Sequence, residues 1–479
     1  MKKAFLILCL AALSLGAAAK VELPAFIGDN MVLQQQTSAA IWGTASPGKK
    51  VTIAPSWTVS KTVVTADSKT GKWSARIATP KAGGPYEIEI SDGEALKISN
   101  VLIGEVWYCS GQSNMEMPFK GYGSQPNTGS AEVIMTAKPS TPIRSCTINK
   151  CSSKTPQETV QTDGWKVNSP EMVANTSATA YWFALKLQAA IDVPVGLLIT
   201  DWGGSTIEAW INEETIRGGF GSEFDLSILT DEAELKGSQL NQRPCVLYNG
   251  QVHALAPYTI GGMIWYQGES NRGRCEQYTR LQTAYVEMMR RLFESPEAPF
   301  YFVQIAPYNY GEPDAWHSGY FYEAQQKTLE TIPNSGMAVT VDAGEWGTIH
   351  PCNKKAVGER LAYLAMTQTY GMKGIEAVAP TYREMKVEGS KIRVTFNVGP
   401  DGMAPMGREV SGFEIAGSDK VFHPAKAMLA NDRKSFNVWS DEVAEPVAVR
   451  YCFRNWGTGT VYNNYGIPAA PFRTDDWQL

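Results

Sequence analysis

The amino-acid sequence predicts an α/β fold in which a parallel sheet covered by helices lies between two β-rich regions. Between residues 100 and 372, apolar runs of strand length alternate with amphipathic segments of helix length, a pattern typical of a parallel sheet with helices on both faces. Before and after that stretch, short runs alternate polar and apolar residues and are separated by turn residues, which indicates antiparallel strands. The chain has 479 residues, more than one domain usually contains.

The first 19 residues have the pattern of a secretory signal peptide. Lys2 and Lys3 precede an apolar run over residues 4–15, and small residues then continue to Ala19, near which cleavage is expected. No later stretch reaches the roughly 18 apolar residues of a membrane-spanning helix. We therefore expect an exported protein without a membrane span, either periplasmic or secreted.

Residues 20–99 and 373–479 form the two β-rich regions. In the first region, "KTVVTADSKTGKWSARI" alternates with a period of two around a turn, which predicts a small β-sandwich-like domain. In the second region, "SKIRVTFNV" and "PVAVRYCFRN" repeat the alternation.

The α/β region, residues 100–372, is expected to contain five sheet strands and four helices. The predicted strands cover residues 101–106, 195–200, 262–266, 300–305 and 337–341, and the predicted helices cover residues 177–191, 276–293, 321–332 and 353–370. In the second helix, apolar residues recur at intervals of three and four, which places them on one face. These residues are Tyr278, Leu281, Tyr285, Met288 and Leu292.

The charge of the chain argues against nucleic acid and anionic membranes as partners. The net charge is -5 and no run is rich in Lys or Arg, so the sequence has no electrostatic signature for nucleic acid or an anionic membrane.

Seven cysteines remain once Cys9, which lies in the predicted signal peptide, is left out. Because seven is an odd number, at least one cysteine cannot pair within the chain. Cys146 and Cys151 enclose four residues with no histidine nearby, which favours a small disulfide loop over a metal site.

Polar loops that contain glycine follow four of the five predicted strands. They cover residues 109–113, 201–205, 267–271 and 342–345, and His350 comes shortly after the last one. In an open parallel sheet, ligands bind at the carboxyl ends of the strands. We therefore expect these loops to converge on a functional site at one edge of the sheet.

Ser113 and His350 are the candidate nucleophile and base within these loops. A serine nucleophile needs a base, most often histidine, and the chain has only four histidines. His253 and His423 are interpreted as structural and His317 as a packing residue in an aromatic loop, whereas His350 follows a sheet strand and precedes a helix. Taken alone, Ser113 is also compatible with an ordinary turn serine, and the coincidence with the His350 loop favours catalysis.

Acyl transfer also needs hydrogen-bond donors for the oxyanion. Four groups in the strand-end loops offer such donors: the backbone amides of Ser113 and Gly204 and the side-chain amides of Gln267 and Asn271. Ser205 and Glu208 have the spacing of a helix capping box, so a structural role is expected for them.

Other chemistries have little support in the sequence. It contains no histidine pair at helical spacing for zinc, no C-x-x-C, no phosphate-binding or dinucleotide-binding glycine motif and no G-x-S-x-G elbow. A glycosidase could draw paired carboxylates from Glu269, Asp342 and Glu345, but it would leave Ser113 and His350 without a role.

Taken together, four stretches resemble the sialate O-acetylesterase family of SGNH-type hydrolases. They are "GEVWYCSGQSNMEMPF", "GLLITDWGGSTIEAWI", "GGMIWYQGESN" and "DAGEWGTIHPCNKKAVGERLA", and flanking stretches such as "LPAFIGDNMVLQQ" and "GIPAAPFRTDDW" extend the similarity over nearly the whole mature chain. The resemblance implies a flavodoxin-like catalytic domain that removes O-acetyl groups from sugars without a metal or cofactor. It also implies that Ser113 is the nucleophile and His350 the base, and that Ser113, Gly204 and an amide of the third stretch hold the oxyanion.

The third member of the catalytic set is less defined. Many SGNH hydrolases have an aspartate three residues before the histidine, but this chain has Gly347 there. Related carbohydrate esterases suggest Glu269 as the acid, while Asp342, Glu345 and a Ser-His dyad oriented by a backbone carbonyl are alternatives.

The substrate and one non-enzymatic alternative also stay open. The acetylated sugar could belong to sialic acid, xylan or another hemicellulose. A secreted carbohydrate-binding protein is the alternative from another class, and the aromatic loop over residues 316–322 would serve it equally well.

Overall fold

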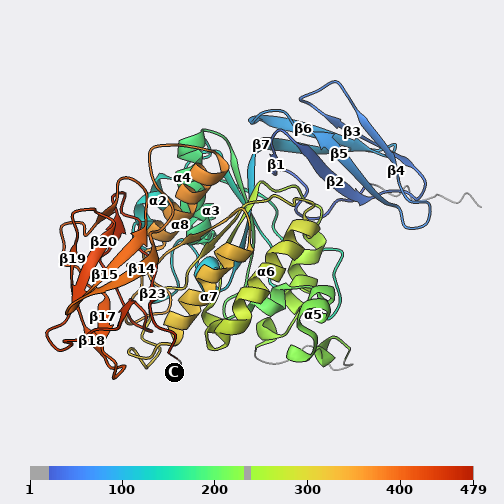
Figure 1. Cartoon of the computed structure of the whole chain (residues 1–479). Coiled ribbons are helices and arrows are strands. Elements are labelled where there is room, and N and C mark those ends of the chain that lie inside the picture. The colour runs from blue at the N-terminus through green and yellow to red at the C-terminus, as the bar shows by residue number, and fades with distance from the viewer. Residues whose placement is uncertain (1–20, 231–238, 478–479) are drawn as a thin grey trace, which may run out of the picture.

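A central sheet organises the molecule, a computed structural model that describes residues 21–230 and 239–477 (Figure 1). Its strands run in the order β13-β12-β11-β7-β10-β8-β9. All neighbours on this path are parallel except β8 and β9. The bounds are β7 (Ala95–Gly111), β8 (Ile143–Thr147), β9 (Lys166–Val167), β10 (Val195–Asp201), β11 (Gly262–Tyr266), β12 (Phe300–Val303) and β13 (Ser335–Ala338).

Helices cover both faces of this sheet. The longer ones are α4 (Ala178–Ile191), α5 (Glu213–Phe220), α6 (Cys275–Leu292), α7 (His317–Thr331) and α8 (Lys354–Leu364), and the shorter ones are α1 (Ser113–Glu116), α2 (Ser130–Thr136) and α3 (Pro170–Asn175). Because side chains alternate along a strand, Trp107 of β7 packs with α4 and α8 on one face, and Tyr108 packs with α6 on the other.

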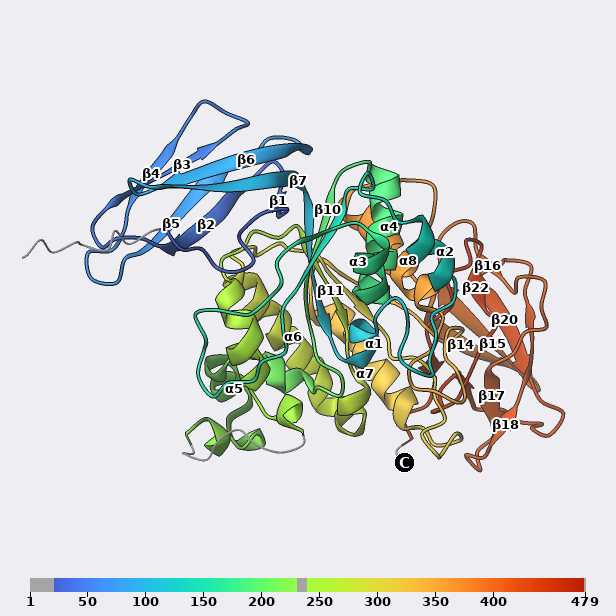
Figure 2. The ribbon, with the colours of Figure 1, turned by 180° about the vertical axis from the view of Figure 1, so that it is seen from behind.

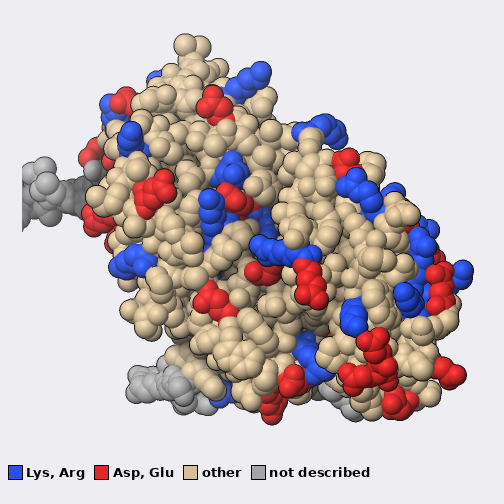
Figure 3. Space-filling view, turned by 90° about the vertical axis from the view of Figure 1, so that its left-hand side faces the viewer, with Lys and Arg blue, Asp and Glu red and all other residues tan. Residues whose placement is uncertain are grey.

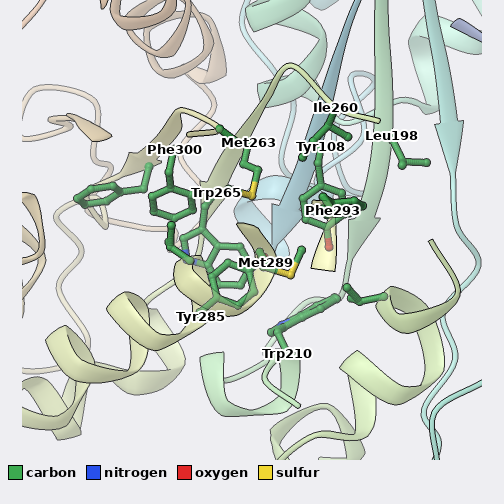
Figure 4. Packing of buried hydrophobic residues seen from close by; sticks show 14 of the residues in the cluster. Tyr108, Leu198, Trp210, Ile260, Met263, Trp265, Tyr285, Met289, Phe293 and Phe300 are labelled. Atoms are coloured by element: carbon green, nitrogen blue, oxygen red, sulfur yellow. The ribbon is translucent and has the colours of Figure 1, made fainter. Parts of the chain in front are cut away.

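The α6 face of the sheet is lined with aromatic rings, as Figure 4 shows. The rings of Trp265 on β11 and Tyr285 on α6 lie 4.5 Å apart, and those of Tyr108 and Phe293 lie 5.2 Å apart. The predicted stripe on this helix is confirmed, since Tyr278, Leu281, Tyr285 and Met288 are buried and Leu292 packs beside them. Burial of these rings anchors α6 to the sheet.

The N-terminal β region shares a strand with the central sheet. Its strands are β1 (Val32–Gln34), β2 (Ser38–Thr44), β3 (Lys50–Pro55), β4 (Thr62–Thr65), β5 (Lys72–Ala78) and β6 (Gly83–Ser91). β6 pairs with the first half of β7, and β10 and β11 pair with its second half. The domain boundary predicted between residues 99 and 100 therefore falls inside a continuous strand.

The C-terminal β region lies on the other side of the α/β unit from the N-terminal one (Figure 1). It contains two four-stranded sheets, β14-β15-β20-β19 and β18-β17-β21-β23, and the pair β16-β22. The bounds are β14 (Thr381–Glu388), β15 (Lys391–Asn397), β16 (Met403–Ala404), β17 (Phe413–Ala416), β18 (Phe422–Pro424), β19 (Lys426–Leu429), β20 (Ser435–Trp439), β21 (Ala448–Tyr451), β22 (Tyr462–Asn463) and β23 (Phe472–Arg473). Inside it, Arg450 pairs with Asp475 through two hydrogen bonds of 2.8 and 2.9 Å.

The predicted α/β fold with flanking β-rich regions is confirmed. All five predicted sheet strands and all four helices are present, although the last helix ends as a π-helical turn over Ala365–Thr369. β8, with the sequence IRSCT, was not predicted, because five residues offer too little periodicity to separate a strand from a loop.

The predicted Cys146–Cys151 disulfide is wrong. Both thiols are free, with Cys146 buried and Cys151 exposed. Cys146 lies on β8, where its sulfur contacts the Thr162 hydroxyl at 3.5 Å. Cys146 therefore contributes to the packing of one face of β8. The predicted signal peptide lies outside the described residues.

Acidic and basic side chains are interspersed over the face shown in Figure 3, which looks onto the side with the C-terminal β region. No single-sign patch covers that face. Among the helices of the described residues, none has the length and apolar character that crossing a membrane requires.

Candidate active site

The carboxyl ends of β7, β10 and β11 lie side by side. The register pairs Gly111, the last residue of β7, with Asp201 of β10 and with Tyr266 of β11. Three of the polar loops predicted to converge therefore leave the sheet at one level. Figure 2 shows α1 at this end of the sheet, away from the N-terminal β region.

Ser113 is the first residue of α1, two residues beyond β7. The turn needs glycine at position 111, which has a φ of 149° and where a Cβ would lie 2.1 Å from the Tyr266 carbonyl oxygen. Gln112 then anchors the chain, since its N–H donates to the same carbonyl at 2.9 Å and its side-chain oxygen accepts from the Gly268 N–H at 3.1 Å. Ser113 is left half-buried at the start of a helical turn.

The glycine loop after β10 lies directly against Ser113. A Cβ built on Gly203 would be 3.3 Å from the Ser113 Cβ, so a larger residue would crowd the serine. The Gly203 N–H donates to the Glu116 carboxylate, which also binds Lys150 at 2.7 Å. Burial and the nearby Glu116 raise the pKa of Asp201 at the end of β10 to about 7.

Two backbone amides at this point are available to a ligand. Within the described part of the chain, neither the Ser113 N–H nor the Gly204 N–H has a hydrogen-bond acceptor. Gly204 has a φ of 73°, a left-handed conformation that glycine adopts without strain. Two such donors beside one hydroxyl suit an oxyanion.

His350 is held by side chains of the irregular segment after α1. Its Nδ1 lies 2.9 Å from the Gln125 side-chain oxygen, and its ring packs edge-on against Tyr122 with centroids 5.3 Å apart. Because an amide oxygen only accepts, this contact places the proton on Nδ1 and leaves Nε2 free of a proton in the neutral ring. Partial burial, assisted by Lys354, lowers the pKa of His350 below 6.5, and Glu116 opposes the shift.

One hydrogen bond joins the Ser113 turn to the His350 loop directly, and a second links the turn to Tyr122, whose ring packs against His350. The Asn114 side chain donates to the Ile349 carbonyl at 3.0 Å, and the Tyr122 hydroxyl, whose ring touches His350, donates to the Ser113 carbonyl at 3.1 Å. Asn114 directly follows Ser113, and Ile349 directly precedes His350. The structure thus brings the predicted nucleophile and base into one cluster.

Glu269 reaches this cluster through Asn114. One carboxylate oxygen accepts from the Asn114 amide at 2.7 Å, and the other is buried without a hydrogen-bond partner among the described residues. Burial raises the pKa of Glu269, while Asn114 and Lys354 partly offset the rise. Lys354 is itself buried and donates to the Pro351 carbonyl at 2.5 Å, and burial lowers its pKa to about 7.

The two alternative acids have other partners. Asp342 receives two hydrogen bonds of 2.7 Å from the Arg360 guanidinium. Glu345 accepts from the Cys352 N–H at 2.7 Å and so closes the His350 loop.

The side-chain amides of Gln267 and Asn271, predicted as oxyanion donors, point into the protein. Gln267 donates to the Ser205 carbonyl at 3.0 Å and to the Asn271 side-chain oxygen at 2.7 Å. Asn271 in turn donates to Glu208 at 3.0 Å, and both amides are almost fully buried. This geometry fits a role in bracing the third loop against the second.

The capping-box interpretation of Ser205 and Glu208 is wrong in its details. The 3₁₀ helix Ile207–Trp210 begins after Thr206, and no side chain caps it. Instead, Ser205 accepts from the Trp210 indole at 3.0 Å, and Glu208 binds Asn271 and the Arg274 guanidinium. Both residues nonetheless have structural contacts, as expected.

Two of the other three histidines contact residues outside this cluster. His253 lies 3.3 Å from the Tyr248 hydroxyl, and His423 lies 3.0 Å from Glu442. The packing role predicted for His317 is wrong, because His317 is the exposed first residue of α7. The aromatic segment over residues 316–322 that favoured a binding protein is not the predicted loop, because α7 begins at His317, and Phe321 and Tyr322 are buried.

Comparison with known proteins places this geometry in context. Residues 103–366 match the family described as carbohydrate esterase, sialic acid-specific acetylesterase. The chain is 27% identical to the sialate O-acetylesterase of Mus musculus over 97% of this chain and 96% of the relative. It is 28% identical to that of Homo sapiens over 76% of this chain and 74% of the relative.

A solved structure agrees with the fold along almost the whole chain. It is a carbohydrate acetylesterase from Xanthomonas citri, which is 32% identical, with a TM-score of 0.84, and the match covers 95% of this chain and 100% of the other.

Proposed function

Since the chain belongs to the sialic acid-specific acetylesterase family of carbohydrate esterases, it is a carboxylic ester hydrolase, and we propose that it removes O-acetyl groups from sugars. Ser113 is the nucleophile and His350 the base. The observation that carries this assignment is the hydrogen bond from the Asn114 side chain, next to Ser113, to the Ile349 carbonyl, next to His350.

The first half of the reaction forms an acetyl-enzyme. His350 accepts the Ser113 proton on Nε2 while the serine oxygen attacks the acetyl carbonyl. The lowered pKa of His350 keeps the imidazole neutral, and so able to act as a base, at neutral pH. The backbone N–H groups of Ser113 and Gly204 stabilise the oxyanion, and the sugar hydroxyl leaves with the proton from His350.

The second half returns the free enzyme. His350 takes a proton from water, the resulting nucleophile attacks the acetyl group on Ser113, and acetate leaves as the serine regains its proton. Each step needs only these side chains, the two amides and water.

Glu269 is proposed as the orienting acid, acting through Asn114. Its carboxylate fixes the Asn114 amide, and that amide fixes the Ile349 carbonyl next to His350. Asp342 and Glu345 are the alternatives, although their contacts with Arg360 and the Cys352 amide suit support of the loop. A dyad without an acid is the remaining alternative, because the Nδ1 proton already has Gln125 as its acceptor.

The decisive experiment compares the wild type with Ser113→Ala on an aryl acetate and on acetylated sugars. We expect the rate of acetate release to fall by a factor of about 10³ or more, because residual catalysis without the nucleophile comes only from binding and the oxyanion donors. The exposed Ser222 provides the control, since Ser222→Ala should keep the wild-type rate. An undiminished rate in Ser113→Ala would refute the assignment.

The proposed substrate is an O-acetylated sialic acid, with acetylated xylan or another hemicellulose as the alternative. Measuring acetate release from each of these glycans distinguishes them. Binding of a glycan without acetate release from any of them would instead favour a carbohydrate-binding protein.

A further inference from the structure

The tryptophan at the tip of the His350 loop is exposed to solvent. Trp346 is 52% exposed, and Tyr465 is the only other exposed side chain among the Phe, Trp and Tyr residues that the structure describes. Glu345 and Thr348 form a β-bridge, so Trp346 and Gly347 make up the tip of a tight turn. Exposure of so large an apolar surface is unfavourable in water.

The exposed indole is nevertheless held in place. The Asn309 side chain donates to the Trp346 carbonyl, and the Trp456 ring packs edge-on against the indole at 5.6 Å with an interplanar angle of 86°. Glu345, the preceding residue, is fixed by the Cys352 N–H. A preorganised aromatic side chain loses little freedom when a ligand covers it.

The neighbours of Asn309 and Trp456, the two residues that contact Trp346, include aromatic and polar side chains. Tyr308 and Tyr310 pack edge-on at 4.8 Å, and the Arg272 guanidinium lies 3.8 Å from the Tyr310 ring centroid. Arg272 also donates to Asn455, the neighbour of Trp456, at 2.9 Å. A pyranose ring has the matching chemistry, with a face of C–H groups for an indole and hydroxyl groups for polar side chains.

The position of Trp346 relates it to the reaction. Trp346 precedes His350 by four positions, and an extended chain of that length spans at most about 14 Å. The Ile349 carbonyl, next to His350, accepts a hydrogen bond from the side chain of Asn114, the residue after Ser113. The indole therefore lies within the reach of a short oligosaccharide from the ester.

We infer that Trp346, backed by Trp456 of the C-terminal β region, binds the pyranose ring of the sugar whose acetyl ester reacts at Ser113. This inference rests on the proposed esterase function and adds how the sugar is selected. It also gives the C-terminal β region a part in substrate recognition, because it supplies the ring that supports Trp346.

The test compares acetylated sugars with ethyl acetate, which has no ring for the indole to bind. The sugars are an O-acetylated xylo-oligosaccharide and a 9-O-acetylated sialyl glycoside, so either source of the pyranose is covered. For Trp346→Ala we expect the ratio of kcat/KM on the sugar to kcat/KM on ethyl acetate to fall about ten-fold, mainly through a higher KM. Trp346→Phe, which keeps an aromatic face, should recover most of the ratio.

A matched control is Tyr465→Ala, which removes the other exposed aromatic side chain and should leave the ratio unchanged. An equal loss on both substrates would mean that Trp346 only supports the His350 loop, and the inference would be wrong. An unchanged ratio, or a wild type that hydrolyses ethyl acetate but neither sugar, would also overturn it.

A binding measurement separates this inference from the proposed mechanism. In the Ser113→Ala background, calorimetry should show that the intact acetylated sugar binds about ten-fold more weakly when Trp346→Ala is added. Equal binding by the single and double variants would refute the sugar platform and leave the mechanism intact. Full activity of Ser113→Ala would refute the mechanism.

Discussion

The two segments that meet at the active site are held in different ways. The Ser113 segment, residues 111–116, continues β7, and the Gln112 N–H in it donates a hydrogen bond to the Tyr266 carbonyl of the sheet. The His350 segment, residues 342–352, is an irregular loop between β13 and α8 and is held by side chains such as Gln125 and Asn309. The register of the sheet therefore fixes the nucleophile, whereas contacts among several loops fix the base.

This difference predicts effects of very different size for the same substitution in the two segments. Gly111→Ala should destabilise the protein by about 3 kcal/mol or more, because its Cβ would lie 2.1 Å from the Tyr266 carbonyl oxygen at a φ of 149°. Gly347→Ala should change the free energy of unfolding by less than about 0.5 kcal/mol, because nothing lies within 4 Å of its Cβ. Urea unfolding of both variants measures the contrast, and similar destabilisation by the two would contradict it.

The sheet-borne half of the site could be predicted from the sequence. The apolar run before Ser113 and the loops after β10 and β11 mark strand ends, and parallel strands place their carboxyl ends together. Ser113 and Gly204 are therefore expected at one edge of the sheet, and the register between β7 and its two neighbours brings their loops together there.

The half of the site on the His350 loop was harder to predict from the sequence. Tyr122 and Gln125 lie in an irregular segment without periodicity, and their contacts with His350 depend on the tertiary path of the chain. From the sequence alone, the side-chain amides of Gln267 and Asn271 could donate to a ligand. In the fold they donate instead to the Ser205 carbonyl and to Glu208. Residue type shows which groups can donate, but only the fold shows where they point.

The second prediction tests how the acid reaches the His350 segment. Glu269→Gln should lower kcat roughly ten- to a hundred-fold, because misplacement of a catalytic group costs rates of that order. Glu345→Gln keeps an oxygen for the Cys352 N–H, so its rate should stay close to that of the wild type. Asp342→Asn should act mainly on stability, since it weakens the pair with Arg360.

Steady-state kinetics together with melting curves separate these outcomes. A large loss of kcat in Glu345→Gln or Asp342→Asn, at an unchanged melting temperature, would move the role of orienting acid to that residue. Wild-type rates in all three variants would favour the dyad.

The smallest expected effect concerns the charges that surround His350. The rate should fall as the pH drops through the pKa of His350, because only the neutral ring accepts the Ser113 proton. Burial and Lys354 lower that pKa and Glu116 raises it. The wild type should thus stay active at a lower pH than an unperturbed histidine would allow.

Two substitutions that keep side-chain size should move this acid limb in opposite directions. Lys354→Met removes a positive charge, so the pKa of His350 rises and the limb moves to higher pH. Glu116→Gln removes a negative charge, so the pKa falls and the limb moves to lower pH. The pH dependence of kcat/KM for both variants measures the shifts independently of any change in the maximal rate. If both limbs moved in one direction, or neither moved, His350 would not be the group that titrates, and the loop-borne half of the site would need another base.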